Sequence, residues 1–460
     1  MAPIYFGVMA AAMTISPANT SYVSSELSRA LALGKAKILI AHPRNLDVAL
    51  DAAQAAGIPR SHVFSIIRDP QQRVRMWMDV LVDLDQPGLP PVRLTHEGSK
   101  STVAYLCFSS GTTGTSKGVM TSHYNCISLA MESDKFAGSL SNPEHKVLIA
   151  VIPLYHFAGI YRMFNMSITQ GHTTVIVDKY LITRMCEAIQ RFKVTDLPAA
   201  PPILIHLVNN PAVDKYDLSS LQAISVGSAP IGADVIRRVI EKYNVGYGLT
   251  EVSPAIAYQL PDFARPDSVG RVIPCMRYRI VDEIGKELGI DQPGELLVKG
   301  PNVMLGYKDN DEATRAALDK DGWLHTGDIV KVDKEGNVYI VDRIKELIKY
   351  KGFQVAPVEL EAVLLSCPYV ADAAVIGVYD DKQGTELPLA YVVLRAEYKS
   401  NAQKLAQKIR EYVDSRVAAH KRLRGGVRII DHIEKSEAGK ILRRAMKELY
   451  ANEQKATAKL

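Results

Sequence analysis

SSGTTGTSKG, residues 109–118, is the stretch that most strongly constrains how this chain folds and what it binds. It follows the apolar run YLCF at residues 105–108, which is typical of a buried strand. Its glycines let backbone N–H groups approach phosphate oxygens closely, and its hydroxyls add further donors. Lys117 supplies a positive charge that can follow departing phosphates. The stretch therefore predicts a phosphate-binding loop after a buried strand.

The P-loop of nucleoside triphosphatases is the first alternative for this loop. That motif needs four residues between its first glycine and a Gly-Lys pair, followed by serine or threonine. Here Ser116 precedes Lys117 and Gly118 follows it, so the spacing does not fit. A Ser/Gly-rich surface loop without a ligand is the second alternative, and the apolar run leading into the loop disfavours it.

The composition indicates a globular protein of mixed α/β class. A length of 460 residues exceeds what one hydrophobic core usually organises, so we expect two domains or one large domain with an appendage. The charge of +5, from 55 basic and 50 acidic residues, is too evenly balanced to predict a nucleic-acid partner. The cysteines lack the spacing of a zinc site or disulfide framework, which favours a reducing compartment. They are Cys107, Cys126, Cys186, Cys275 and Cys367.

Both ends of the chain carry short segments that bear on localisation. The apolar run 4–15 is too short to span a bilayer and has no basic residue before Arg29, so we expect buried core and no transmembrane segment. The last residues, Ala458-Lys459-Leu460, resemble the Ser-Lys-Leu address that the peroxisomal import receptor binds. A frayed helix end is the alternative. We expect a peroxisomal protein, or otherwise a cytoplasmic one.

The order of predicted elements divides the chain into two domains. Up to residue 342, short β-rich runs alternate with helical stretches, which predicts a large domain of βαβ-type sheets with a small β-rich subdomain after Arg277. Residues 343–460 read as a small α+β domain, with helices over 359–365 and 402 to about 419. The β-rich runs of the large domain are residues 37–40, 105–108, 147–152, 174–177 and 223–226.

Four later motifs resemble, in order and spacing, the core motifs of the acyl-adenylate-forming superfamily, to which the loop 109–118 is also similar. They are YGLTE at 247–251, GWLHTGD at 322–328, DRIKELIKYKGFQVAP at 342–357 and GKILRR at 439–444. Within the superfamily the chain resembles the 4-coumarate:CoA ligase-like branch, which includes fungal acyl-CoA ligases. The resemblance implies an ATP-dependent acid:CoA ligase of secondary metabolism, with an acyl-AMP intermediate. It also implies a mobile C-terminal domain, with a hinge near Lys345.

The expected reaction explains the residue types in these motifs. A carboxylate must attack the α-phosphate of ATP, so the site must hold a triphosphate with Mg²⁺ and shield two anions from each other. Glu251 is a suitable oxygen ligand for Mg²⁺, and Thr250 can donate to the α-phosphate; alone, the pair would more often be a helix N-cap with a first-turn acid. Lys440, after Gly439, can bridge the carboxylate and the α-phosphate, with a solvent-exposed lysine as the alternative.

The resemblance also implies how the nucleotide is held. Asp328 is expected to accept hydrogen bonds from the ribose, and Arg343 to reach the ribose or a phosphate; Asp328 would otherwise be a turn aspartate. Small residues at 227–229 leave room for the flat adenine. The residues expected to contact ATP or AMP are Ser109, Ser110, Gly111, Thr112, Thr113, Gly114, Lys117, Gly227, Ser228, Ala229, Gly246, Tyr247, Gly248, Thr250, Asp328, Arg343, Lys345, Lys349, Gln354 and Lys440.

Further residues are expected, by the same resemblance, to bind CoA and the acid. Lys351 and Gly352 are candidates for CoA, because glycine leaves space for the pantetheine arm, and Lys179 is a weaker one. His156 is expected to gate the acyl and thiol channels, with a buried structural histidine as the alternative. The expected acyl pocket is Tyr155, His156, Phe157, Ala158 and Asn209. The expected catalytic residues are Lys440, Thr250, Glu251 and His156, with Glu251 as the metal ligand.

Three departures from the family pattern affect these expectations. The chain begins close to a segment, residues 6–27, that lies well inside relatives, so we expect an N-terminally shortened member and keep an impaired or silent paralogue as an alternative. Ser116 and Glu437-Ala438 replace residues that are usually Pro and Pro-Ser, which loosens both loops. Asn209 and Ala158 replace side chains of the plant enzymes, which argues against 4-coumarate as the substrate. A non-CoA acceptor is a further alternative.

Overall fold

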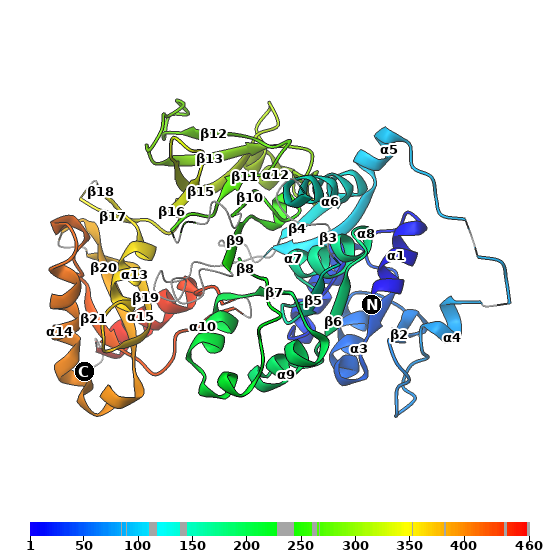
Figure 1. Ribbon diagram of the computed structural model, residues 1–460, viewed down its shortest axis with the longest axis horizontal. Helices are drawn as coiled ribbons and strands as arrows, with labels where there is room; N and C mark the ends of the chain where they lie inside the picture. The colour runs from blue at the N-terminus through cyan, green and yellow to red at the C-terminus, as the bar shows by residue number, and fades with distance from the viewer. Residues whose placement is uncertain are drawn as a thin grey trace.

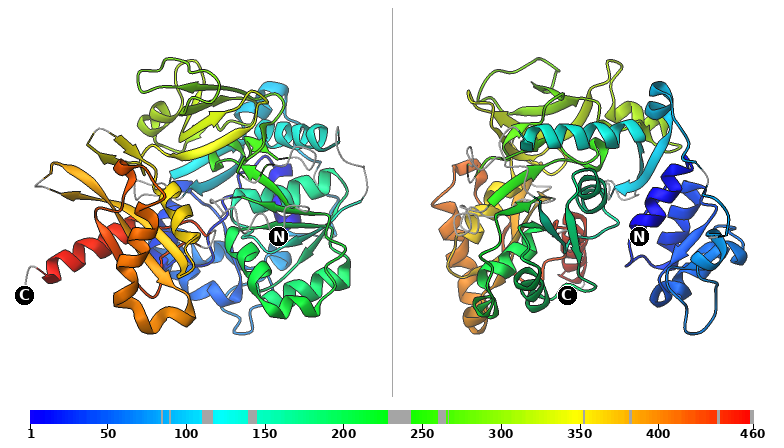
Figure 2. Two further views of the ribbon diagram at one scale, coloured as in Figure 1. Left: turned by 60° about the vertical axis from the view of Figure 1, so that its left-hand side comes forward. Right: turned by 45° about the vertical axis from the view of Figure 1, so that its right-hand side comes forward.

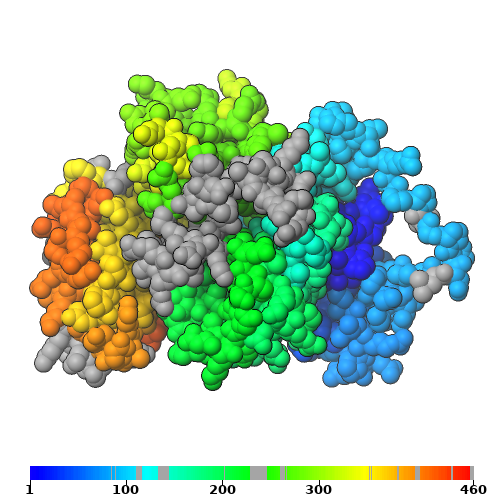
Figure 3. All heavy atoms as spheres, viewed as in Figure 1, coloured from blue at the N-terminus to red at the C-terminus, as the bar shows by residue number. Residues whose placement is uncertain are grey.

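The computed structural model of the chain describes residues 1–83, 85–88, 90–109, 117–138, 145–227, 243–259, 265, 267–351, 353–380, 383–436 and 439–457. The segment that follows Arg343 forms one end of the molecule, and the first hundred residues form the opposite end (Figure 1, Figure 3). The sheets that flank the predicted motifs at 109–118 and 247–251 and carry the one at 322–328 lie between these two ends (Figure 1). The α/β class predicted from the sequence is confirmed.

A seven-stranded sheet forms the centre of the molecule, in the order β11-β10-β9-β8-β7-β5-β6. The five strands β5 to β9 pair in parallel, and β10 and β11 extend the sheet in antiparallel pairs. Helices connect β5 to β6, β6 to β7 and β7 to β8, and these helical crossovers return the chain to the same edge of the sheet, which makes the strands parallel. The strands are β5 Val147–Ala150, β6 Thr173–Ile176, β7 Asp196–Ala199, β8 Ala223–Val226, β9 Tyr243–Tyr247, β10 Ala257–Tyr258 and β11 Arg271–Val272.

The helices beside this sheet bury one apolar face each. In α9, Ile182–Phe192, the residues Ile182, Met185, Cys186 and Ile189 are buried at helical spacing, as the sequence predicts. The other elements here are α6 His123–Gly138, α7 Phe157–Ile160, the π-helical turn η3 Tyr161–Met166, α8 Ser167–Thr169 and α10 Pro201–Asn209.

Two smaller sheets complete the large predicted domain. The hairpin β3–β4 joins β14 in one sheet, and the antiparallel sheet β12-β13-β15-β16 forms the β-rich part after Arg277 (Figure 1). The strands are β3 Val103–Ser109, β4 Lys117–Ser122, β14 Gly306–Tyr307, β12 Arg277–Val281, β13 Gly294–Lys299, β15 Leu324–Val332 and β16 Val338–Arg343, with helix α12 Asp311–Ala317 beside β14.

The C-terminal segment has its own sheet and its own core. Its strands are β17 Ile348–Tyr350, β18 Phe353–Val355, β19 Val370–Asp380, β20 Thr385–Leu394 and β21 Gly426–Ile429, and its helices are α13 Pro357–Leu365, α14 Ala402–Asp414 and α15 Arg443–Thr457. A cluster of buried side chains that begins at Ile348 and ends at Met446 fills this unit. The left view of Figure 2 shows α15 extending outward from the sheet. The predicted helix from 402 to about 419 ends earlier, at Asp414, and a short 3₁₀ turn follows at Ala419–Lys421.

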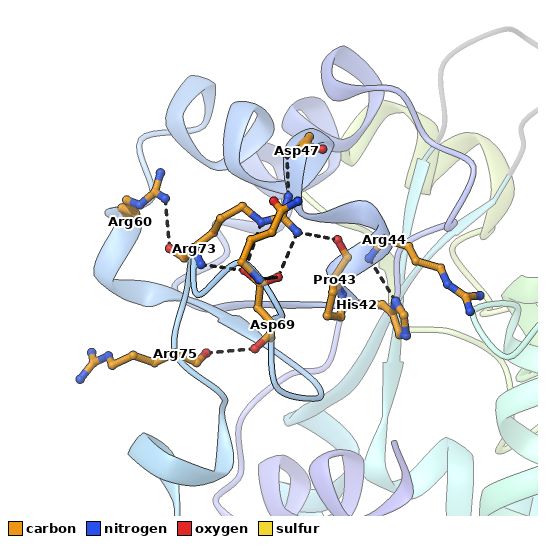
Figure 4. A network of polar contacts seen from close by, with 10 residues as sticks. His42, Pro43, Arg44, Asp47, Arg60, Asp69, Arg73 and Arg75 are labelled. Atoms are coloured by element: carbon orange, nitrogen blue, oxygen red, sulfur yellow. Dashed lines mark hydrogen bonds and ion pairs between the residues drawn. The ribbon is translucent and has the colours of Figure 1, made fainter.

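The N-terminal end consists of short elements around a small apolar core of their own, with polar contacts beside it. Arg73 Nε donates to Asp69 Oδ2 at 3.1 Å, and its Nη1 reaches Asp47 Oδ1 at 2.8 Å (Figure 4). The bond from Arg73 lowers the pKa of Asp69 to about 2. The elements are α1 Ala2–Ala10, α2 Ser24–Gly34, β1 Leu39–Ala41, α3 Leu46–Ala55, β2 Val63–Ser65, α4 Met78–Leu81 and α5 His96–Ser101.

The apolar run 4–15 is only partly buried. Tyr5 and Ile15 are buried, and Ile15 N donates to Ala104 O at 2.9 Å beside β3. The residues between them are half-buried or exposed, so the expectation that the run is core holds for its two ends only. No helix in the described part of the chain combines the length and apolar character needed to cross a bilayer.

Candidate active site

A cavity of about 770 Å³ lies where the central sheet, the β-rich part and the C-terminal segment meet. Most of the predicted site residues that the structure describes line it, although they come from segments more than 300 positions apart. They are Ser109, Lys117, Tyr155, His156, Phe157, Ala158, Gly227, Gly246, Tyr247, Gly248, Thr250, Glu251, Arg343, Lys345 and Lys440. Side chains that sequence reasoning missed also line it: Arg162, Ser225, Tyr258, Glu295, Tyr307, His325 and Ser436.

Other predicted site residues lie elsewhere. Asp328 lies directly behind Tyr247 and Arg343, while Lys179, Asn209, Lys349 and Lys351 are not among the residues lining the cavity. Ser110, Gly111, Thr112, Thr113, Gly114, Ser228, Ala229 and Gly352 fall outside the described residues, as do Ala458, Lys459 and Leu460 and the side chain of Gln354.

The base of the predicted phosphate loop is a hairpin. Strands β3 and β4 pair antiparallel, with Ser109 opposite Lys117, so the two residues that flank the predicted loop lie side by side. Lys117 Nζ lies 4.7 Å from the ring centroid of Tyr307, which is a cation–π distance. The Tyr307 hydroxyl donates to Glu251 Oε1 at 2.9 Å. Tyr307 therefore connects the phosphate-loop lysine with the predicted metal ligand, a link that only the tertiary structure reveals.

The turn that carries Thr250 and Glu251 is tightly constrained. A Cβ on Gly248 would lie 1.8 Å from the Pro254 carbonyl oxygen, so only glycine fits there. The fully buried Asn302 amide donates to the carbonyls of Val252 and Ala255, at 2.7 and 2.8 Å. These contacts fix the 3₁₀ turn Thr250–Val252, and with it the direction in which Glu251 enters the cavity.

A buried carboxylate supports the cavity wall from behind. Asp328 on β15 pairs with Arg343 on β16, and Arg343 Nε lies 2.8 Å from Asp328 Oδ1. The Tyr247 hydroxyl donates to Asp328 Oδ2 at 2.5 Å. Burial raises the pKa of Asp328, although Arg343 and the Tyr247 bond oppose the shift. Burial and the nearby Asp328 carboxylate raise the pKa of Tyr247. Asp328 thus positions two side chains that line the cavity.

Lys440 enters the cavity from a compact loop. Gly439 adopts a positive φ of +79°, and Ser436 and Lys440 exchange bonds in which Ser436 N donates to Lys440 O at 2.9 Å and Lys440 N donates to Ser436 Oγ at 3.2 Å. Burial, helped by the charge of Arg343, lowers the pKa of Lys440. An anionic ligand beside Lys440 would therefore stabilise its charged ammonium form.

Behind this loop, Arg443 bridges two carboxylates. Its Nη1 lies 3.1 Å from Glu346, and its Nη2 lies 2.9 Å from both oxygens of Glu361. Burial raises the pKa of Glu361 to about 7 and that of Asp342 to about 6. Arg443 belongs to the GKILRR motif, but nothing in the sequence indicates these partners.

On the predicted acyl side of the cavity, Tyr155 and His156 form a pair of rings that we call the aromatic corner. The rings of Tyr155 and His156 lie 4.6 Å apart, and His156 is the N-cap of α7. Burial lowers the pKa of His156, which favours the neutral imidazole. A Cβ on Gly159 would lie 2.3 Å from the Pro153 carbonyl oxygen, so glycine is required for this corner to close. The predicted pocket residue Asn209 ends α10 and does not reach the cavity lining.

The residues predicted to bind CoA lie on a separate hairpin. In β17–β18, Lys349 pairs with Gln354, and Lys351 at the turn has a positive φ of +47°. The exposed ring of Phe353 stacks on His420 at 4.6 Å between centroids. This hairpin does not reach the cavity in the described arrangement.

Two family models match this chain, one in its N-terminal part and one in its C-terminal part. The family model described as "AMP-binding enzyme" matches residues 1–308, and "AMP-binding enzyme C-terminal domain" matches residues 359–440. The chain is 37% identical to 4-coumarate-CoA ligase 1 of Narcissus pseudonarcissus, over 95% of this chain and 79% of the relative. It is 36% identical to 4-coumarate--CoA ligase-like 9 of Oryza sativa subsp. japonica, over 99% and 82%. The crystal structure of ATP-bound MatB from Rhodopseudomonas palustris has a TM-score of 0.85 and 27% identity, over 97% and 86%.

Proposed function

Because the chain belongs to the AMP-binding enzyme family, we propose that it is an ATP-dependent acid:CoA ligase that works through an acyl-adenylate. The resemblance to the acyl-adenylate-forming superfamily and to its 4-coumarate:CoA ligase-like branch is confirmed. The observation that carries the proposal is that Lys440, from the C-terminal segment, enters the same cavity as Lys117, Glu251 and Arg343.

The charge of the cavity suits a triphosphate beside a carboxylate. Among the described residues, five cations line it, Lys117, Arg162, Arg343, Lys345 and Lys440, against the two carboxylates Glu251 and Glu295. Fixed cations in a partly desolvated site stabilise the charge that develops as one anion attacks another. This excess of positive charge supports adenylation of an acid.

In the first half-reaction, a substrate carboxylate oxygen attacks the α-phosphorus and pyrophosphate leaves. We assign Lys440 to the attacking carboxylate and the α-phosphate, Thr250 to the α-phosphate, and Lys117 to the departing pyrophosphate. In the second half-reaction, the CoA sulfur attacks the acyl carbon and AMP leaves. We assign His156, held neutral at the aromatic corner, to the boundary between the acyl and thiol paths.

Mg²⁺ is the metal we propose for the triphosphate, with Glu251 as its protein ligand. In the described parts of the chain, no group of three or more His, Cys, Asp or Glu side chains is placed to hold a metal ion. That fits Mg²⁺, which is usually held by one or two carboxylates together with substrate phosphates. When bound, the ion would neutralise phosphate charge; Tyr307 orients the Glu251 carboxylate for it.

The remaining predicted sites form part of the same proposal. Asp328 is assigned to the ribose, through its place beside Tyr247 and Arg343. Lys349 and Gln354, with Lys351 and Gly352, are assigned to the face that the C-terminal domain would present during thioester formation, after turning about Lys345. Lys179, exposed after β6, is a candidate for a CoA phosphate.

Peroxisomal import through Ala458-Lys459-Leu460 is also proposed. The tripeptide follows α15, which ends at Thr457. A fluorescent reporter carrying residues 443–460 should accumulate in peroxisomes, and removal of the last three residues should leave it in the cytosol. A reporter that stays cytosolic with the tripeptide intact would contradict this localisation.

The proposed function is tested with purified protein, ATP, Mg²⁺, CoA and a panel of fatty and aromatic acids. Pyrophosphate release and thioester formation should both occur. Lys440→Ala should lose adenylation by at least about 100-fold while still converting supplied acyl-AMP to thioester. Lys435→Ala, whose ammonium pairs with Asp372 outside the cavity, is the matched control. Pyrophosphate release without thioester would indicate another acceptor, and neither product would indicate a silent paralogue.

A further inference from the structure

Arg162 is a cation on the cavity wall that no step described above uses. It lies on the π-helical turn Tyr161–Met166, and its Nη2 donates to Ser225 Oγ at 3.2 Å. Its Nε is buried without a hydrogen-bond partner. No carboxylate in the described ranges lies within 4.0 Å of its guanidinium, although both Arg162 and Ser225 line the cavity.

The position of Ser225 indicates how deep in the cavity this guanidinium lies. Ser225 is on β8 two residues before Gly227, which follows the end of the strand. At roughly 3.3 Å per residue, Ser225 is about 7 Å further along the strand from the end where the nucleotide residues gather. On the neighbouring strand β7, Pro198 pairs with Ser225 and Ala199 with Val226, and both of these uncharged residues also line the cavity. Arg162 therefore marks the part of the acyl site remote from the nucleotide.

Two other cations of the cavity, Arg343 and Lys440, differ from Arg162 in having carboxylates nearby. Arg343 pairs with the buried Asp328, and Lys440 lies within electrostatic reach of Glu346 and Asp328. A guanidinium has donors only and retains its charge, so a buried one is stabilised by an anionic acceptor. With a neutral acyl chain, Arg162 would have no such acceptor among the described residues, whereas a carboxylate can accept two parallel hydrogen bonds from it.

We propose that the acid substrate is a dicarboxylic acid, whose second carboxylate pairs with Arg162 while the first is adenylated. This inference rests on the proposed function, because it names the substrate of the same site. A phenolic hydroxyl is the competing polar group, and it differs from a carboxylate in carrying no charge at neutral pH.

The test compares acids matched in length and shape. Hexanoate is compared with adipate, and cinnamate with 4-carboxycinnamate and 4-hydroxycinnamate. Pyrophosphate release gives kcat/KM, and calorimetric titration in the presence of α,β-methylene-ATP gives the affinity without turnover. The dicarboxylic member should be favoured by about 10- to 100-fold in kcat/KM and in affinity, as expected for a charge-assisted hydrogen-bonded pair.

Variants assign that preference to the guanidinium. Arg162→Met should bring the ratio between matched acids close to one, and Arg162→Lys should keep part of the preference. Ser225→Ala keeps the charge of Arg162 but removes the hydroxyl that accepts its hydrogen bond. Its ratio of kcat/KM between matched acids should fall between those of wild type and Arg162→Met. Thermal unfolding checks that each variant folds; if Arg162→Met does not, the comparison of Arg162→Lys with wild type decides.

The outcomes separate this inference from the proposed function. No preference for the dicarboxylic acid in the wild type, a stronger preference for 4-hydroxycinnamate, or an unchanged ratio in the Arg162 variants would overturn the inference while leaving the ligase intact. Absence of pyrophosphate release with every acid would instead overturn the proposed function. The inference would then be tested by the calorimetric affinities alone, as the ratio between the dicarboxylic acid and its matched monocarboxylic acid.

Discussion

Replacing Tyr307 by phenylalanine tests whether the link between Lys117 and Glu251 matters for adenylation. The change keeps the ring, and therefore the 4.7 Å contact with Lys117, but removes the hydroxyl that donates to Glu251 at 2.9 Å. A hydrogen bond to a charged group contributes about 1.5–3 kcal/mol, and the half-buried position of Glu251 reduces this to about 1–2 kcal/mol. At about 1.4 kcal/mol per tenfold, Tyr307→Phe should lose about 5- to 30-fold in kcat/KM for ATP.

The assay is steady-state pyrophosphate release with ATP varied at saturating acid. Tyr339→Phe is the matched control, because its hydroxyl donates to Asp333 at the same 2.9 Å distance, outside the cavity. That variant should stay within about twofold of wild type. Conversion of supplied acyl-AMP should be unaffected by Tyr307→Phe, since no pyrophosphate departs in that step. Equal losses in the two variants, or in the two half-reactions, would refute the assignment of Tyr307.

Two further predictions concern the turn at Gly248 and the buried Glu361. Gly248→Ala should lower adenylation at least about 100-fold, because its Cβ would lie 1.8 Å from the Pro254 carbonyl oxygen. Gly7→Ala, whose Cβ would have no atom within 4 Å, should leave adenylation unchanged in the same assay. Since the pKa of Glu361 is raised to about 7, its contribution to stability is present below about pH 4.5 and is lost as the pH rises through about 7. Urea unfolding of Glu361→Gln should show a flatter pH dependence across that window, whereas the exposed Glu359→Gln should follow wild type.

The sequence predicts the fold class and much of the cavity for a physical reason. The motifs lie at the ends of strands, and the hydrophobic pattern of the sequence locates many of those strands. Thr250 follows β9 of the central sheet, whereas Lys117 begins β4 and Arg343 ends β16 in two antiparallel sheets, so the three residues converge on one cavity because the three sheets pack together. Helix ends are less predictable: the apolar spacing continues to Val417, but the helix stops at Asp414, whose carboxylate accepts a bond from Leu423 N.

Residues whose roles arise from tertiary contacts could not be predicted in this way. Tyr307 gains its place from the pairing of β14 with β4, which no local pattern encodes. Arg162 lies on a π-helical turn, so helical periodicity does not indicate which way it points. Asn209 is the opposite case. The resemblance predicts it as a pocket residue, but it lies at the end of α10 and does not line the cavity.

The contacts on either side of Lys345 restrict where the predicted hinge can bend. Before it, Arg343 is held by Asp328 on the neighbouring strand, and Ile344 N donates to Gly327 O at 2.9 Å. After it, Glu346 is held by Arg443, which belongs to the C-terminal segment. Arg443 also binds Glu361 in the C-terminal core, so the chain is anchored to that core one residue past Lys345. A rotation of the C-terminal segment that keeps both anchors would have to bend the chain at the predicted hinge and break the bonds across it, in which Glu346 N and Leu347 N donate to Arg343 O at 2.9 and 3.1 Å.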